Sequence, residues 1–279
     1  MEFIKSTLDE GVLILTMDDP PSRNSLGPDM NSEINEQIDI FENDPGMRVL
    51  VLTGTDPAFC SGANVKGFDQ SNKTVQEEDS ITPWQLMDPT QATRHKNSDA
   101  QISRIKFLPW RLWQLQKPTI AALNGYAFGV GAGLSLCCDI RIASENAVFS
   151  ESFVRMGLVP GDGSSWQLPR LVGLSNTFLM QYTGDRYDAK QCFEMGLVSK
   201  IVDHDKLMET TLELAKKIAA GPTFSHGLIK YLIHSGLETS FQQGLAESNA
   251  ALSLARKTND HKEGARAFVE KRPPKFVGN

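Results

Sequence analysis

Two apolar runs that each lead into a turn of small residues constrain the fold of this chain more than any other feature. Residues 49–53 (VLVLT) precede the turn at 59–64 (FCSGAN), and residues 119–123 (TIAAL) precede the turn at 129–133 (GVGAG). Glycine lets a backbone approach a ligand closely, and the N–H groups at a helix start have no partner inside the helix. If the two turns meet, their N–H groups can converge on one oxygen, as in the oxyanion holes that stabilise a thioester enolate or a tetrahedral intermediate.

Strands and helices alternate around these turns. Residues 12–17 (VLILTM) form a further apolar run, which ends at the proline pair of DDPP (18–21). Gly27-Pro28 then opens a segment whose apolar residues recur at helical spacing: Met30, Ile34, Ile38 and Phe41. Proline favours the first position of a helix, and this spacing gives the helix one apolar face. The order strand, helix, strand predicts an α/β fold with a layered core and right-handed crossovers.

The pattern changes after Val202, where consecutive helices are expected. Gly221-Pro222 ends one helical pattern and starts the next, and residues 241–254 and 260–269 also read as helices. We therefore predict a core over residues 1–203 and a helical C-terminal region over 204–279. Polar residues dominate the stretch near 69–106, which we interpret as an insertion that contains some helix.

Charge and cysteine content exclude several classes of protein. A net charge of −6 and a pI near 5.4 argue against a nucleic-acid binder, which usually carries clustered Lys and Arg. No apolar run approaches the ~20 residues that span a membrane, and the N-terminus lacks the pattern of a secretory signal. The cysteines show no metal spacing and fit a reducing compartment: Cys60, Cys137, Cys138 and Cys192. We expect a cytoplasmic protein without a metal site and without membrane contact.

A dinucleotide-binding turn is the first alternative for Gly129-x-Gly131. That fingerprint requires glycine or alanine three residues after the second glycine, where this chain has Leu134. The preceding strand also lies mid-chain and does not open a βαβ unit with an acidic residue about twenty positions on. Dinucleotide binding of the Rossmann type is therefore not expected.

Several motifs, in order, resemble those of the enoyl-CoA hydratase/isomerase (crotonase) family. They lie at residues 59–66, 117–129, 138–143, 156–161, 189–202 and 268–276, so the resemblance covers nearly the whole chain. It implies a spiral of repeated ββα units, with C-terminal helices that build trimers, often paired into hexamers. It also implies an acyl-CoA thioester substrate, no cofactor beyond the CoA moiety, and a place in fatty acid metabolism.

The resemblance also assigns binding residues. The thioester carbonyl accepts hydrogen bonds from the main-chain amides of Ala63 and Val130, although the family usually has glycine where Val130 stands. The segment with Arg23, Ser25 and Leu26 matches a family stretch that lies along the CoA. The remaining candidates for the substrate site are Ser61, Gly62, Asn64, Val65, Lys66, Tyr126, Gly129, Phe153, Pro160 and Gly161.

The acid–base residues depart from the hydratase pattern. The two glutamates of family hydratases correspond to Gly133 and Phe153, neither of which can transfer a proton. Isomerase members instead carry one acidic residue at the position of Gly161, next to Asp162 of this chain. Asp162 is the predicted general base, because burial beside an acyl group raises a carboxyl pKa toward a useful value. Glu151 is the second candidate.

Each of these residues also has a plainer interpretation. Asp162-Gly163 is a common turn signal, and Glu151 can be a surface carboxylate or part of a salt bridge. Ser164 and Ser165 read as capping and packing residues of the next helix, and the histidines read as surface or packing residues.

We expect proton transfer by a single carboxylate, such as double-bond isomerisation of an enoyl-CoA. Three alternatives stay open. The chain can hydrate an enoyl-CoA with a non-standard acid and base. It can hydrolyse an acyl-CoA with Asp162 activating water, or it can be a non-catalytic scaffold that binds a CoA ligand.

Overall fold

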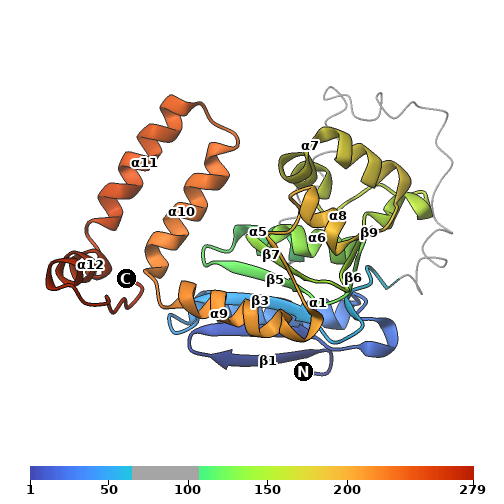
Figure 1. The fold of residues 1–279 in the computed structure, drawn as a ribbon, viewed down its shortest axis with the longest axis horizontal. Coiled ribbons are helices and arrows are strands. Elements are labelled where there is room, and N and C mark those ends of the chain that lie inside the picture. Colours follow the sequence, from blue (N-terminus) through green and yellow to red (C-terminus); the bar gives the residue numbers. More distant parts are fainter. Residues whose placement is uncertain (65–106) are drawn as a thin grey trace.

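The computed structural model describes residues 1–64 and 107–279 and has an α/β fold (Figure 1). The larger sheet has six strands, of which β1 and β2 pair antiparallel and all others pair parallel. In spatial order they are β1 (Ile4–Asp9), β2 (Val12–Met17), β3 (Val49–Gly54), β5 (Thr119–Leu123), β7 (Ile140–Ser144) and β10 (Lys200–Val202). The strands β3 and β5 are buried along their whole length, as their continuous apolar runs predict.

A second sheet of four short strands repeats the order of the first. Its strands are β4 (Ala58–Cys60), β6 (Tyr126–Phe128), β8 (Val148–Ser150) and β9 (Tyr187–Asp188). Each of the first three follows directly after a strand of the larger sheet, so the chain passes from β3 to β4, from β5 to β6 and from β7 to β8. These paired strands, with helices between the pairs, confirm the predicted α/β spiral.

Helices cover the sheets on the sides where the apolar residues point. The predicted helix at residue 28 is α1 (Pro28–Asn43), and it buries the four apolar residues that its spacing marked. The other core helices are α5 (Leu108–Gln114), α6 (Val130–Cys137), α7 (Ser164–Thr183) and α8 (Ala189–Glu194), with short 3-10 helices at η1 (Pro20–Ser22), η5 (Ser152–Met156) and η6 (His204–Lys206). The helix α6 therefore starts at the residue whose amide the sequence marked.

Only helices follow β10 in the described chain. They are α9 (Leu207–Ala219), α10 (Thr223–Gly236), α11 (Phe241–Ala255) and α12 (Asn259–Glu270). Figure 1 shows α9 along the larger sheet, whereas α10, α11 and α12 extend away from it. In α9 the side chains of Thr211, Ala215 and Ala219 are buried, and Ala215 and Ala219 lie in a second apolar cluster with Val12 and Val49. The boundary at 203/204 stays a prediction.

Two contacts fix the C-terminal helices to the core. The guanidinium of Arg48 donates to the carbonyls of Ala219 and Phe276, both at 3.1 Å. On α10, Lys230 is buried and pairs with Asp139 at 2.9 Å. Because a buried ammonium needs a partner, this pair sets where α10 meets the core.

The sequence analysis did not assign the strand β1, and the insertion predicted near 69–106 lies outside the described residues. All four cysteines are free and buried. Within residues 1–64 and 107–279, no helix is long and apolar enough to cross a membrane.

Candidate active site

The ends of three neighbouring strands bring the predicted site residues together. The strands β4, β6 and β8 pair parallel, with Cys60 opposite Ala127 and Phe128 opposite Ser150. Parallel strands end at the same edge of a sheet, so the segments that follow them emerge side by side. These segments hold Ser61 to Asn64, Gly129 to Val130 and Glu151 to Phe153.

The two glycine turns pack directly against each other. A Cβ on Gly131 would overlap with the carbonyl of Cys60, and one on Gly62 would lie 3.0 Å from the carbonyl oxygen of Phe128. Gly62 (φ +108°) and Gly129 (φ +50°) also have backbone conformations that favour glycine. The absence of a side chain at Gly62 and Gly131 therefore lets the two turns pack against each other. The sequence analysis expected glycine to admit a ligand and did not foresee this contact.

The amide of Ala63 is left free by the bridge that holds its turn. Leu26 donates its N–H to the carbonyl of Gly62 at 2.8 Å and accepts from the N–H of Asn64 at 3.3 Å. In a parallel bridge of this kind, the N–H of the central residue points away from the partner strand. The N–H of Ala63 thus faces away from Leu26, and Ala63 itself is exposed.

The amide of Val130 is the first of α6, so it has no acceptor within that helix. Among the described residues, neither this N–H nor that of Ala63 has a hydrogen-bond acceptor. The partial positive charge at the helix N-terminus adds to the attraction for negative charge. Two unpaired donors on packed turns are what an oxyanion site requires.

A buried asparagine secures the segment that precedes α1. The side chain of Asn24 donates to the carbonyls of Thr55 at 2.8 Å and Ala58 at 2.7 Å, and its oxygen accepts from the N–H of Asp19 at 2.9 Å. The carbonyl of Arg23 accepts from the N–H of Ser61 at 3.0 Å. These contacts hold the segment against the first glycine turn.

The side chains of this segment face two directions. Arg23 is exposed, and its guanidinium lies 5.7 Å from the centre of the Tyr126 ring. Ser25 and Leu26 are partly buried. The candidates Val65 and Lys66 lie outside the described residues.

Asp162 occupies space that the missing side chain of Gly133 leaves open. A Cβ on Gly133 would overlap with Oδ2 of Asp162, while Oδ1 accepts from the N–H of Ser164 at 3.0 Å. Gly133 lies one helical turn after Val130, so both share one face of α6. Asp162 is buried, and burial raises the pKa of its carboxyl, opposed by the hydrogen bonds from Ser164. Its Oδ2 has no hydrogen-bond partner in the described chain.

Glu151 is fully buried, so its interpretation as a surface carboxylate is wrong. Its Oε2 accepts from Oγ of Ser164 at 2.7 Å and from Nε2 of Gln181 at 3.5 Å, whereas Oε1 has no partner among the described residues. Burial, and then repulsion by Asp162, raises the pKa of Glu151 to about 8. Ser164 therefore contacts both carboxyl groups, and its interpretation as a capping and packing residue is incomplete.

The loop before α7 opens onto a cavity of about 920 Å³ between α5, α7 and α10. Gly161 is exposed there, and a Cβ on it would meet nothing within 4 Å. Pro160 is partly buried, and the Phe153 ring lies 3.8 Å from where a Cβ of Gly129 would stand. Gly161, where isomerase members carry an acidic residue by resemblance, is therefore exposed. The carboxyl of the next residue, Asp162, is buried.

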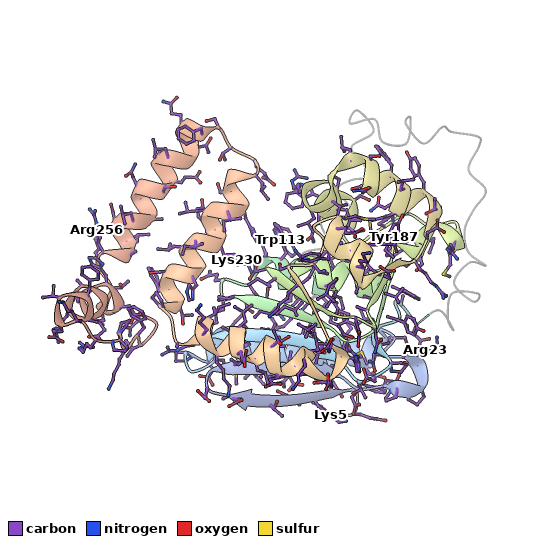
Figure 2. The ribbon with its side chains drawn as sticks, viewed as in Figure 1. Lys5, Arg23, Trp113, Tyr187, Lys230 and Arg256 are labelled. Carbon is purple, nitrogen blue, oxygen red and sulfur yellow. The ribbon has the colours of Figure 1, made fainter. Side chains whose placement is uncertain are left out.

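Aromatic side chains from α5, α7 and α10 line this cavity. Trp113 stacks on His234 with ring centres 3.8 Å apart and meets Trp166 edge to face at 5.0 Å. Figure 2 shows Trp113 and Lys230 between α10 and the core. The packing role expected for histidines fits His234. Nothing in the sequence linked these rings, because they come from α5, α7 and α10.

In the described part of the chain, no group of three His, Cys, Asp or Glu side chains is arranged to hold a metal ion.

Comparison with known proteins identifies relatives over the whole length of the chain. A family model described as enoyl-CoA hydratase/isomerase matches residues 7–91 and 87–279. The chain is 35% identical over 281 residues to 1,2-epoxyphenylacetyl-CoA isomerase of Escherichia coli K12, covering 100% of this chain and 99% of that protein. It is 35% identical over 265 residues to mitochondrial enoyl-CoA hydratase of Pongo abelii, covering 94% and 82%. A crystal structure of enoyl-CoA hydratase from Bacillus anthracis superposes with a TM-score of 0.83 at 30% identity, covering 99% and 100%.

Proposed function

The chain belongs to the enoyl-CoA hydratase/isomerase family and is an enzyme of that family, and from this premise we propose that it isomerises enoyl-CoA thioesters with Asp162 as its base. The observation that carries the proposal is the position of the Asp162 carboxyl. It is buried in the space beside Gly133, one helical turn from the amide of Val130. A base at this place faces a thioester whose oxygen is bound at the start of α6.

The reaction needs one proton carrier and one site for negative charge. Asp162 removes a proton from the α carbon of a 3-enoyl thioester, and the electron pair moves onto the thioester oxygen. The amides of Ala63 and Val130 donate to that oxygen, each worth ~3 kcal/mol of barrier by analogy with known oxyanion holes. Asp162 then returns the proton to the γ carbon, which gives the 2-enoyl thioester.

Residues near the glycine turns are proposed to hold the CoA. Arg23 is exposed and therefore free to meet a phosphate, and the main chain of Ser25 and Leu26 runs beside it. Ser61 and Asn64 belong to the adjacent turn, and Asn64 is exposed. No cofactor beyond the CoA moiety enters this reaction, and a cytoplasmic location stays a prediction.

Self-association into a homotrimer, or into a dimer of trimers, is also proposed. Large apolar side chains stand exposed on the C-terminal helices, among them Ile229 at 52%, Ile233 at 60% and Phe241 at 86%. Apolar surface of this extent is typical of a protein–protein interface.

Hydration with a non-standard acid and base is the second candidate. The observation that favours it is Glu151, a second buried carboxyl that Ser164 links to Asp162. Two carboxyls of different pKa can divide the roles of acid and base. Hydration would add water across the double bond of crotonyl-CoA, whereas isomerisation adds nothing.

The proposal is tested with Asp162→Asn, a near-isosteric change that removes the base. We expect turnover of a 3-enoyl-CoA to fall by ~10²-fold or more, because a positioned general base contributes about this factor. Asp185→Asn is the matched control, since Asp185 is exposed and forms a surface ion pair with Arg155 at 2.9 Å. If Asp162→Asn retains isomerase turnover, or the wild type only hydrates crotonyl-CoA, the proposal fails.

A further inference from the structure

Two carboxyl groups on different elements share one serine at this site. Ser164 donates its N–H to Asp162 at 3.0 Å and its hydroxyl to Glu151 at 2.7 Å. Asp162 is 4% exposed and Glu151 is 0% exposed. Each also has one buried oxygen without a hydrogen-bond partner in the described chain, Oδ2 and Oε1.

In the part of the chain that the structure describes, no cation pairs with either carboxyl; Lys230 on α10 lines the same cavity as Asp162 but pairs with Asp139 at 2.9 Å. Among the described residues, neither Asp162 nor Glu151 takes part in a salt bridge, and the charged group that Glu151 faces is Asp162 itself. From α6, Cys137 faces Asp162, but burial raises the pKa of its thiol to about 12, so it stays neutral. From α7, Ser164 and Gln181 face Glu151, and both are uncharged. Two buried negative charges without a cation are too costly to coexist.

We propose that Glu151 and Asp162 form a coupled pair that holds one proton at rest, with Glu151 as the positioning residue whose neutral form leaves Asp162 ionised as the base. This inference rests on the proposed role of Asp162. It adds a second residue to the mechanism. It also requires Glu151 to be neutral, a condition that isomerisation by one carboxylate does not include.

The hydrogen bonds decide which carboxyl keeps the proton. The main-chain N–H of Ser164 can only donate, so it favours the ionised form of Asp162. A serine hydroxyl also donates to a neutral carboxyl, whose own proton then sits on the other oxygen. In Glu151 that oxygen is Oε1, which has no donor pointed at it in the described chain. The amide of Gln181 also donates to Glu151, but at 3.5 Å, whereas the main-chain N–H on Asp162 lies at 3.0 Å. Glu151 is also the more deeply buried of the two, so neutral Glu151 and ionised Asp162 are the arrangement with the lower free energy.

The charge of Glu151 then limits the reaction at high pH. The thioester oxygen becomes negative during proton transfer, and a second negative charge beside the site opposes this. The rate therefore rises as Asp162 ionises and falls as Glu151 ionises. The fall in rate at high pH therefore reports an apparent pKa of the coupled pair, and loss of the proton from Glu151 is its main cause.

The test is the pH–rate profile of 3-enoyl-CoA isomerisation between pH 5 and pH 10. With the pKa of Glu151 at about 8, wild-type kcat at pH 9 is expected about tenfold below its maximum. Glu151→Gln keeps the shape but cannot ionise, so its kcat at pH 9 is expected to stay within about twofold of its value at pH 7. An unchanged alkaline limb in Glu151→Gln overturns the inference.

Ser164→Ala provides a second variant in case Glu151→Gln does not fold. It removes the hydroxyl that stabilises ionised Glu151 and keeps the N–H to Asp162, so the alkaline limb moves to higher pH, and Ser164→Thr restores it. Ser253→Ala is the matched control, because its exposed hydroxyl on α11 donates to the carbonyl of Asn249 at 2.9 Å and contacts neither carboxyl. An alkaline limb that does not move in Ser164→Ala also overturns the inference. Loss of turnover in Asp162→Asn, by contrast, tests only the base.

Discussion

The carboxyl of Asp162, from the loop before α7, lies where a side chain at position 133 of α6 would stand. The carboxyl fits there because residue 133 is glycine. In family hydratases, by resemblance, a glutamate stands at this helix position. Here the loop before α7 supplies the carboxyl instead. A side chain at residue 133 would overlap with the carboxyl of Asp162 in its present position.

Gly133→Ala is expected to lower kcat by ~10²-fold, because displacement of a catalytic group by about 1 Å has this effect. The added methyl would overlap with Oδ2 of Asp162 and push the carboxyl away from the helix. Steady-state kinetics with a 3-enoyl-CoA measure the change, and thermal unfolding monitors the fold. Gly236→Ala is the control, since a Cβ there meets nothing within 4 Å. Wild-type kcat in Gly133→Ala would show that Asp162 is not the base.

Sequence patterns found some of these residues and not others. Asp162 is a candidate from sequence because the family resemblance places an acidic residue at the adjacent position of this loop. Ser164 was not assigned to both carboxyls, since its contact with Glu151 spans 13 positions and depends on the fold. Asn24 was overlooked for the same reason, because its acceptors lie 31 and 34 positions away.

At the scale of elements, the site depends on three parallel strands that end together. The strands β4, β6 and β8 are only three residues long, so the segments that follow them need further support. Asn24 gives this support at β4, where it bonds to the carbonyls on both sides of the turn between β3 and β4.

Asn24→Ala is expected to destabilise the protein by about 2–4 kcal/mol, because it leaves several buried carbonyl and N–H groups without partners. Denaturant unfolding measures this change. Asn43→Ala is the control: its side chain bonds to the carbonyl of Asp39 on an exposed helix turn, and we expect a change within about 0.5 kcal/mol. Equal effects in the two variants would contradict the role assigned to Asn24.

Apolar periodicity predicted several of the buried elements and did not mark a strand at the edge of the sheet. The strands β3 and β5, and the helix α1, follow directly from their runs and spacing. The edge strand β1 (IKSTLD) pairs on one side only, and most of its residues are not buried, so no apolar run marks it. Convergence of the strand ends needs the order of strands in the sheet, which the motif order gave only through family resemblance.

At the scale of the whole molecule, the C-terminal helices leave much apolar surface uncovered. Lys230 and Arg48 fix these helices to the core, so the exposed side chains are held in place by the monomer itself. A preformed apolar surface loses little entropy on association, which favours assembly.

Ile233→Asp is expected to shift the protein from trimer or hexamer to monomer, because a charge buried in an apolar interface is unfavourable. Ile233 lies on α10 with 60% of its surface exposed. Sedimentation velocity measures the masses. Leu8→Asp on β1, at 55% exposure, is the control and should keep the wild-type mass. A monomeric wild type would refute the proposed assembly.

The two parts of this site stand on different kinds of structure. The amides at Ala63 and Val130 follow strands of one sheet, whereas Asp162 stands on a loop beside a glycine. If the proposed roles hold, exchange of a few loop and helix positions can replace the proton carrier and leave the two amides that bind the thioester in place. A lineage built in this way can diversify its reactions while it inherits a single means of activating a substrate.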